Sequence, residues 1–241
     1  MTNAGRTFHC DGYWRRRSTR PIAMPVGRAS PHRAHFSVTM GRDVDLLGAL
    51  DKASDEFERR LARMPDDGWT LPTPCPEWDV NYLVAHVVGG NRFATLILDG
   101  LPASEAIERV MSTPQLGDDA MSAWTSTTAA QARAFHSPDA LERRVDHPLG
   151  PLSGRRFLEF RVFDLALHAW DLARAIDADD ALDPDLVDVV LGIVETDPAG
   201  MGFGITALDR ADHDGPPQTR LLHLTGREHR WPRNDVAAVT D

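Results

Sequence analysis

Residues 161–175 constrain the fold most, because this stretch can form only a long helix with a buried face. Its sequence, R-V-F-D-L-A-L-H-A-W-D-L-A-R-A, contains no proline or glycine and several good helix formers. Apolar residues recur at the three- and four-residue spacing of one helix stripe. They are Val162, Leu165, Ala166, Ala169, Leu172 and Ala173.

Three other segments carry a similar pattern, so the chain is predicted to be all-α. The long helices are expected at residues 43–64, 80–98, 118–135 and 161–175. Shorter helices are expected at 104–111, 183–196 and 218–225, and a loop or small irregular hairpin at 141–156. Four long helices with a long linker between the second and third predict a four-helix bundle with extra short helices.

Charge and cysteine content exclude several classes of partner. The formal net charge of −10 argues against binding of nucleic acid by the folded part. No apolar run approaches the length that crosses a bilayer, so no membrane partner is expected. Two cysteines, Cys10 and Cys75, make no disulfide framework and favour a reducing, cytoplasmic location.

The first forty residues differ from the rest of the chain. They hold seven arginines against the single acid Asp11, a net charge of +6 that leaves −16 for the remainder. With no helical periodicity, this segment is predicted to be a disordered basic tail, and Met40 is a candidate for the true first residue. The expected organisation is a tail at 1–40, the helical bundle at 41–230 and a C-terminal tail at 231–241.

Three side chains are candidates for one metal site. Asp164 and His168 lie four residues apart, so on a helix they share one face. His86 lies at the edge of the apolar stripe of the second helix, and bundle interiors collect side chains from facing helices. Two imidazoles and a carboxylate suit Zn²⁺ first and also Ni²⁺ or Fe²⁺, with a position left for water or substrate. The alternatives are a buried polar network, or a solvated Asp–His pair with a core histidine.

Two motifs together resemble a known family. T-P-C-P-E-W-D-V-N-Y-L-V-A-H-V-V-G-G and F-D-L-A-L-H-A-W-D-L-A-R-A are similar to the DinB-like metal-binding bundles, specifically the mycothiol-dependent maleylpyruvate isomerase N-terminal-domain family. The ending Q-T-R-L-L-H-L-T-G-R resembles compact actinobacterial metal-binding members, and the resemblance covers residues 43–227. It implies that His86, Asp164 and His168 are the metal ligands. The isomerase has Glu where this chain has Asp164, and it has a second, C-terminal domain where this chain has a short tail.

The resemblance implies a metal-dependent thiol transferase or isomerase. Mycothiol would be the thiol cofactor, a small electrophile the substrate, and a homodimer is compatible with such bundles. The alternatives are a non-catalytic metal-binding or ligand-sensing bundle, and a purely structural one.

Three further side chains have two interpretations each. Asp171 either hydrogen-bonds a ligand imidazole or is a solvated partner of Arg174. Arg161 either binds a substrate or cofactor carboxylate or forms an ion pair with Asp164. Cys75, between two prolines, is a reactive thiol, an extra metal ligand or a packing residue.

Overall fold

A computed structural model of the chain describes residues 44–197, 207–208 and 214–228. Within these ranges it forms seven α helices, one short 3₁₀ helix and one two-stranded hairpin, which confirms the all-α class. None of the helices described is both long enough and apolar enough to cross a bilayer. The predicted tails at 1–40 and 231–241 lie outside the described residues.

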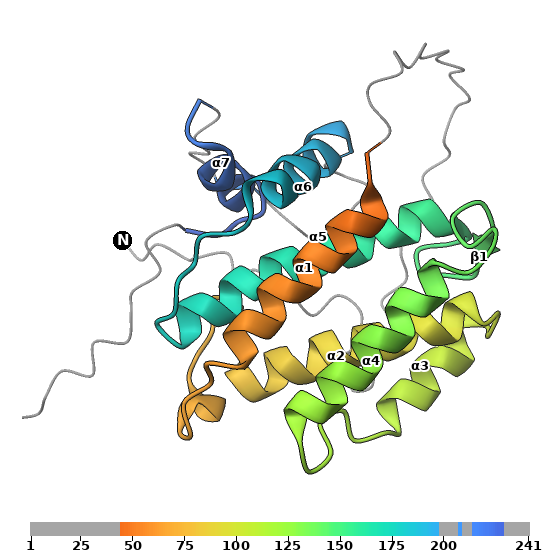
Figure 1. Cartoon of the computed structure of the whole chain (residues 1–241), viewed down its shortest axis with the longest axis horizontal. Helices are drawn as coiled ribbons and strands as arrows, with labels where there is room; N and C mark the ends of the chain where they lie inside the picture. The colour runs from red at the N-terminus through yellow and green to blue at the C-terminus, as the bar shows by residue number, and fades with distance from the viewer. Residues whose placement is uncertain (1–43, 198–206, 209–213, 229–241) are drawn as a thin grey trace, which may run out of the picture.

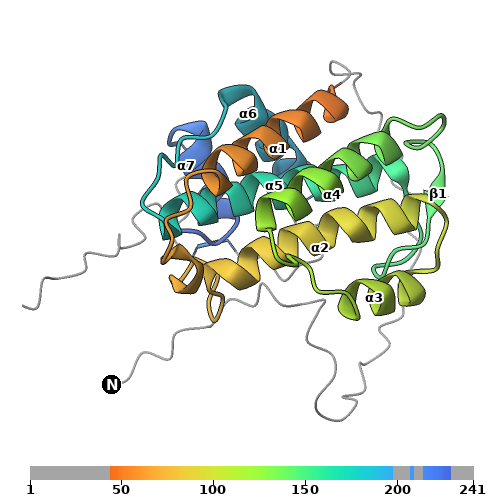
Figure 2. The same cartoon turned by 60° about the horizontal axis from the view of Figure 1, so that its bottom comes forward.

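Four long helices form the body of the molecule (Figures 1 and 2). Helix α5 packs against α1 and α2, and α4 packs against the same two helices, so each long helix has two neighbours. Helix α3 lies on α2, while α6 packs on α5 and α1 and carries α7. The long helices are α1 (Leu46–Leu61), α2 (Val80–Leu98), α4 (Ala120–Phe135) and α5 (Gly154–Ala175). The short ones are α3 (Ala103–Met111), α6 (Pro184–Thr196) and α7 (Pro217–Leu224).

Helix α5 is more deeply buried than its sequence pattern indicates. Every residue from 160 to 175 is buried except Asp164, which is half-buried. The single predicted stripe is therefore only one of its buried faces, because α1, α2 and α6 together surround the helix. A helix enclosed in this way must also bury its polar side chains, and those need partners inside the protein.

The link before α5 contains a hairpin, which was one of the two structures predicted for residues 141–156. Strands β1 (Arg144–Val145) and β2 (Leu152–Ser153) pair antiparallel. Ser153 then caps α5, and its side chain accepts the N–H of Arg156. The helix therefore begins at Gly154, seven residues before the predicted start at 161. Gly154 lets the first turn of α5 lie against the backbone of Ala140, because a Cβ at residue 154 would be 1.7 Å from the carbonyl oxygen of Ala140.

The proline-rich segment between α1 and α2 is anchored by its tryptophans. After the 3₁₀ helix η1 (Gly68–Thr70), Trp78 is buried and Trp69 packs against the core. Asp79 is the N-cap of α2, and its side chain accepts the N–H of Tyr82 at 2.7 Å. The segment therefore ends in a fixed position at the start of α2.

The two central glycines of α2 do not break the helix. Adjacent glycines weaken a helix, but α2 is continuous through Gly89 and Gly90. A Cβ at Gly90 would lie 2.4 Å from Nη1 of Arg161 on α5. The second glycine therefore makes room for an arginine of the neighbouring helix.

Candidate metal centre

The three candidate ligands from α2 and α5 lie together. Nε2 of His86 is 3.3 Å from Oδ1 of Asp164, and Nε2 of His168 is 3.4 Å from the same oxygen. One ligand atom from each of the three residues lies within 4.8 Å of the others. The side chains of His86 and Asp164 are 13% and 15% exposed, so the group is accessible from one side.

The two histidines and Arg161 keep Asp164 ionised. Burial alone would raise the pKa of its carboxyl, but His86, His168 and Arg161 together hold that pKa well below its usual value. The two imidazoles respond in opposite directions. Burial lowers the pKa of His86 despite Asp164, whereas Asp164 and Asp171 outweigh burial and raise the pKa of His168 to about 9. The centre thus combines a carboxylate, a neutral imidazole and a second imidazole that faces two carboxylates.

Asp171 holds the ring of His168 through Nδ1, the nitrogen that faces away from the other two candidate ligands. Its Oδ2 lies 2.9 Å from Nδ1 of His168, so the contact with a candidate ligand imidazole is present, while Arg174 pairs with Asp180 at 2.9 Å. Asp171 is fully buried, yet Arg227 and His168 lower its pKa to about 2 against the effect of burial. With Nδ1 held by Asp171, Nε2 of His168 faces Asp164 and His86.

Arg227 is the part of the site that sequence reasoning missed. Its Nε and Nη2 donate to the two carboxylate oxygens of Asp171 at 2.9 and 2.7 Å. It follows α7 in a short segment with no periodicity that could mark it as buried. The one signal was its place at the end of the T-G-R ending that carried part of the family resemblance.

Arg161 forms the predicted alternative, an ion pair with Asp164. Its Nη1 donates to Oδ2 of Asp164 at 2.7 Å, and its Nε and Nη2 donate to the side chains of Gln131 and Asn91, each at 2.8 Å. Asn91 and Gln131 are fully buried on α2 and α4. Arg161 therefore connects three helices and holds Asp164 on the side away from the histidines.

The proline-rich segment closes another side of the site. The Trp78 ring lies over both imidazoles, with centroid distances of 4.8 Å to His86 and 5.5 Å to His168. Cys75 is buried beneath it, and its Sγ lies 3.3 Å from Oδ2 of Asp171 and 3.9 Å from Nδ1 of His168. Cys75, His168 and Asp171 form a second group with ligand atoms close enough for a metal ion.

A pocket opens beside His86 between α2 and α3. It has a volume of about 200 Å³. Tyr82, His86 and Gly89 line it on the α2 side, and Met111 and Gln115 line the opposite wall. Tyr82 and Met111 are two of the exposed large apolar side chains of the described residues. The accessible side of the histidine–carboxylate group thus adjoins a small pocket with a partly apolar rim.

Two crystal structures resemble this fold only loosely. They are of the mycothiol-dependent maleylpyruvate isomerase and of a histidine-to-alanine mutant of it, each with a TM-score of 0.48. The sequence identities are 17% and 16%, and the alignments cover 68% and 62% of this chain and 75% and 68% of those chains.

Sequence comparison gives a firmer result. Two uncharacterized proteins of Mycobacterium tuberculosis, from strains CDC 1551 / Oshkosh and ATCC 25618 / H37Rv, are each 32% identical to this chain over 191 residues. Each alignment covers 78% of this chain and 100% of the relative. The family model described as "Mycothiol maleylpyruvate isomerase N-terminal domain" matches residues 50–173, which include His86, Asp164 and His168. The chain therefore belongs to the mycothiol maleylpyruvate isomerase N-terminal domain family.

Proposed function

We propose that the protein binds a divalent metal ion through His86, Asp164 and His168 and is a metal-dependent thiol transferase or isomerase. The thiol would be mycothiol, as the name of its family suggests, and the second substrate a small electrophile. The observation that carries the metal site is the shared approach of two imidazoles to one carboxylate oxygen. A cytoplasmic location and a homodimer stay predictions.

The spacing of the donor atoms supports a small tetrahedral ion. Ligand atoms that each lie about 2.1 Å from one zinc ion are about 3.4 Å apart. The two N–O separations here are 3.3 and 3.4 Å. Three protein ligands leave the fourth position free for water or a substrate atom, which is typical of catalytic zinc sites. Zn²⁺ is therefore the first candidate, with Ni²⁺ or Fe²⁺ as alternatives for the same donor set.

The group of Cys75, His168 and Asp171 is the less suitable of the two. Both oxygens of Asp171 accept hydrogen bonds from Arg227, and Nδ1 of His168 faces Asp171 rather than a free position. This arrangement is typical of a carboxylate that orients a ligand histidine from behind its ring. The ligand nitrogen of His168 is then Nε2, on the side of Asp164 and His86.

Each neighbouring residue has a defined task in this proposal. A bound divalent ion lowers the pKa of a thiol that ligates it, so that the thiol reacts as its thiolate at neutral pH. Asp171 keeps the Nδ1 proton on His168, and Arg161 holds Asp164 in position by its second oxygen. Trp78 shields both imidazoles from water, and the pocket beside His86 receives the electrophile.

Metal analysis of purified protein tests the site. We expect about one divalent ion per chain in the wild type, and loss of that ion in His86→Ala and His168→Ala. His136→Ala is the matched control, because His136 is exposed at the end of α4. Wild-type protein without a divalent ion, or His86→Ala with an unchanged ion content, would contradict the proposal.

Assays of thiol transfer and of isomerisation test the chemistry. Mycothiol is incubated with epoxides, haloalkanes or maleylpyruvate, and with protein that is metal-loaded, chelator-treated, or treated and then reloaded. We expect activity that disappears with the chelator and returns with Zn²⁺. Transfer to an epoxide or haloalkane is followed by loss of the thiol, whereas isomerisation returns the thiol and is followed by the conversion of maleylpyruvate. A metal-loaded protein that catalyses neither reaction would instead support the non-catalytic metal-binding or ligand-sensing alternative.

A further inference from the structure

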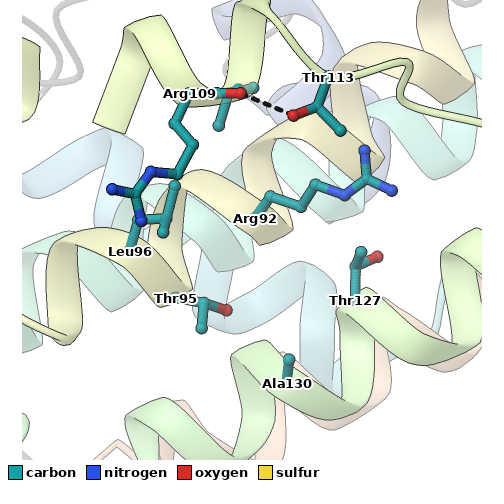
Figure 3. A pocket seen from close by; sticks show the side chains of 8 residues that line it. Arg92, Thr95, Leu96, Arg109, Thr113, Thr127 and Ala130 are labelled. Atoms are coloured by element: carbon teal, nitrogen blue, oxygen red, sulfur yellow. Dashed lines mark hydrogen bonds between the residues drawn. The ribbon is translucent and has the colours of Figure 1, made fainter. Parts of the chain in front are cut away.

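The pocket beside His86 has no permanently charged side chain in its walls. No lysine, arginine, aspartate or glutamate is among the described residues that line it. A second pocket, on the other side of the contact between α2 and α3, differs in this respect, because Arg92 and Arg109 line it (Figure 3). The arginines of these two helices thus line a pocket apart from the metal centre, and the pocket that adjoins the centre is left without a cation.

Gln115 and Thr113 use their polar groups within the protein. Nε2 of Gln115 donates to the carbonyls of Val110 and Thr113 at 2.5 and 2.6 Å. Its Oε1 accepts the N–H of Nη1 of Arg92 at 2.9 Å. The hydroxyl of Thr113 donates to the carbonyl of Arg109 at 2.8 Å. The donors of both side chains are thus occupied, and an anion would have to displace one of these bonds to gain a partner.

The rim of this pocket is apolar and adapts in shape. Tyr82 and Met111 are exposed there, and the Tyr82 ring packs against Trp78 with a centroid distance of 4.8 Å. The thioether of Met111 has several rotatable bonds and makes favourable contacts with aromatic rings. The pocket has a volume of about 200 Å³. Since an apolar cavity of about 150 Å³ holds benzene, one aromatic ring with a short substituent fits this pocket.

An anion in this pocket would lose its water without gaining a cation. Burial of an unpaired carboxylate is strongly unfavourable, whereas burial of a hydrocarbon surface is favourable. In the proposed function the thiol sulfur occupies the free position of the ion, so the ion does not supply the missing partner. The pocket therefore selects a body that is uncharged.

We infer that the electrophilic substrate is uncharged and apolar, with a body the size of a benzyl group that lies between Gly89 and Met111. Its reactive carbon lies at the end of the pocket that His86 lines. After the thiol proton has passed to solvent, the thiolate sulfur forms a bond to this carbon, and a halide leaves with the electron pair. This assignment of substrate class rests on the proposed function, whereas binding of an apolar body does not need the thiol.

Gly89 sets the room inside this pocket. A Cβ at residue 89 would lie 3.4 Å from Oε1 of Gln115 and 3.5 Å from Cγ1 of Val110, two residues that also line the pocket. Packed side chains tolerate such contact distances. Gly89→Ala should therefore keep the fold and gain helix propensity, while its methyl group fills part of the space that the substrate body occupies.

Equilibrium binding of two unreactive probes tests the pocket directly. The probes are toluene and benzoate, which differ in a methyl group against a carboxylate. They are titrated against the full chain, and the methyl signal of Met111, identified by its loss in Met111→Leu, is followed by NMR. We expect toluene to shift this signal and to bind at least about tenfold more tightly than benzoate. Equal affinity for both probes, or tighter binding of benzoate, would overturn the inference.

Gly89→Ala and Gly192→Ala form a matched pair of variants. Gly192 lies in α6 and does not line the pocket, so both variants add one methyl group to a helix and only Gly89→Ala adds it to this wall. We expect toluene affinity to fall about tenfold in Gly89→Ala and to stay unchanged in Gly192→Ala. The same affinity in both variants would contradict the placement of the substrate body.

A reactive pair separates this inference from the proposed function. The electrophiles are benzyl bromide and 4-(bromomethyl)benzoate, each with mycothiol and each corrected for the uncatalysed rate. We expect kcat/KM to be at least about tenfold higher for benzyl bromide, and Gly89→Ala to reduce that value but not the value for bromoethane. Toluene binding without thiol transfer would reject the proposed function alone, whereas transfer that favours the anionic electrophile would reject the uncharged substrate alone.

Discussion

Arg227 binds both carboxylate oxygens of Asp171 across 56 residues of sequence. The contact is the last step of a chain of interactions from the C-terminal segment to the candidate metal centre, because Asp171 in turn holds Nδ1 of His168. Asp171 is fully buried, so its charge depends on this partner. The segment after α7 is therefore linked to the orientation of a ligand imidazole on α5.

Replacement of Arg227 should weaken metal binding without removing a ligand. In Arg227→Gln, Asp171 loses its bidentate partner and holds His168 less firmly, so we expect zinc affinity to fall about 10- to 100-fold. Competition with a chromophoric chelator measures the affinity. The control is Arg220→Gln on α7, which removes an ion pair with Glu195 distant from the centre and should leave the affinity unchanged. A folded Arg227→Gln protein with wild-type affinity would disprove the linkage.

A methyl group at Gly90 should disturb the candidate metal centre through Arg161 and Asp164, on the side away from Arg227. In Gly90→Ala the new Cβ meets Nη1 of Arg161 at 2.4 Å, so the guanidinium must leave its ion pair with Asp164. We expect a loss of about 2–4 kcal/mol in the free energy of unfolding, together with weaker zinc binding. Denaturant unfolding measures the first quantity and chelator competition the second.

Gly192 offers the matched control for that substitution. It lies within α6, and no atom of the described residues comes within 4 Å of the position of an added Cβ. Gly192→Ala should therefore stabilise the protein by up to about 1 kcal/mol through helix propensity. If both variants changed stability in the same direction, the contact at Gly90 would not be the cause.

His147 should make stability depend on pH. Its ring is buried against Phe93, Phe157 and Phe160, and burial lowers its pKa to about 4 despite the opposing charge of Asp146. Because the unfolded chain has the ordinary value of about 6.5, it binds a proton that the folded chain does not bind between these two values. Stability should thus be highest above pH 6.5 and fall as the pH drops towards 4, by up to about 3 kcal/mol from this residue.

His147→Asn isolates that contribution. An asparagine side chain can still accept the N–H of Leu149, which Nδ1 of His147 accepts at 3.2 Å, but it does not titrate. The difference in unfolding free energy between wild type and variant, measured by urea denaturation from pH 7 to pH 4, should shrink as the pH falls. A constant difference would show that the pKa of His147 is the same in the folded and the unfolded chain.

Local sequence patterns predicted the helices and the side chains that share a helix face, because both depend on helix geometry. The four-residue spacing of Asp164 and His168 and the apolar stripe of α2 were sufficient to place three side chains at one point. They could not indicate Arg227, because its contact with Asp171 depends on how an irregular segment after α7 returns to α5. Nor could they show that α5 is buried on more than one face, since that burial depends on the packing of other helices. The predicted metal-ligand roles stay predictions.

Cys75 distinguishes the two groups that could hold the ion, because they share His168. If the ligands are His86, Asp164 and His168, Cys75→Ala should retain its zinc, since the variant keeps all three ligands and loses the contacts of Sγ with Asp171 and His168 and a small buried volume. A destabilisation of about 1–2 kcal/mol is then expected from the cavity, together with an unchanged chelator titration. Cobalt substitution gives a second readout, because a thiolate ligand produces intense charge-transfer absorption that nitrogen and oxygen ligands lack. Such a band in the wild type and its loss in Cys75→Ala would move the ion to the group of Cys75, His168 and Asp171. Its absence from both proteins would leave Cys75 as a packing residue beneath Trp78.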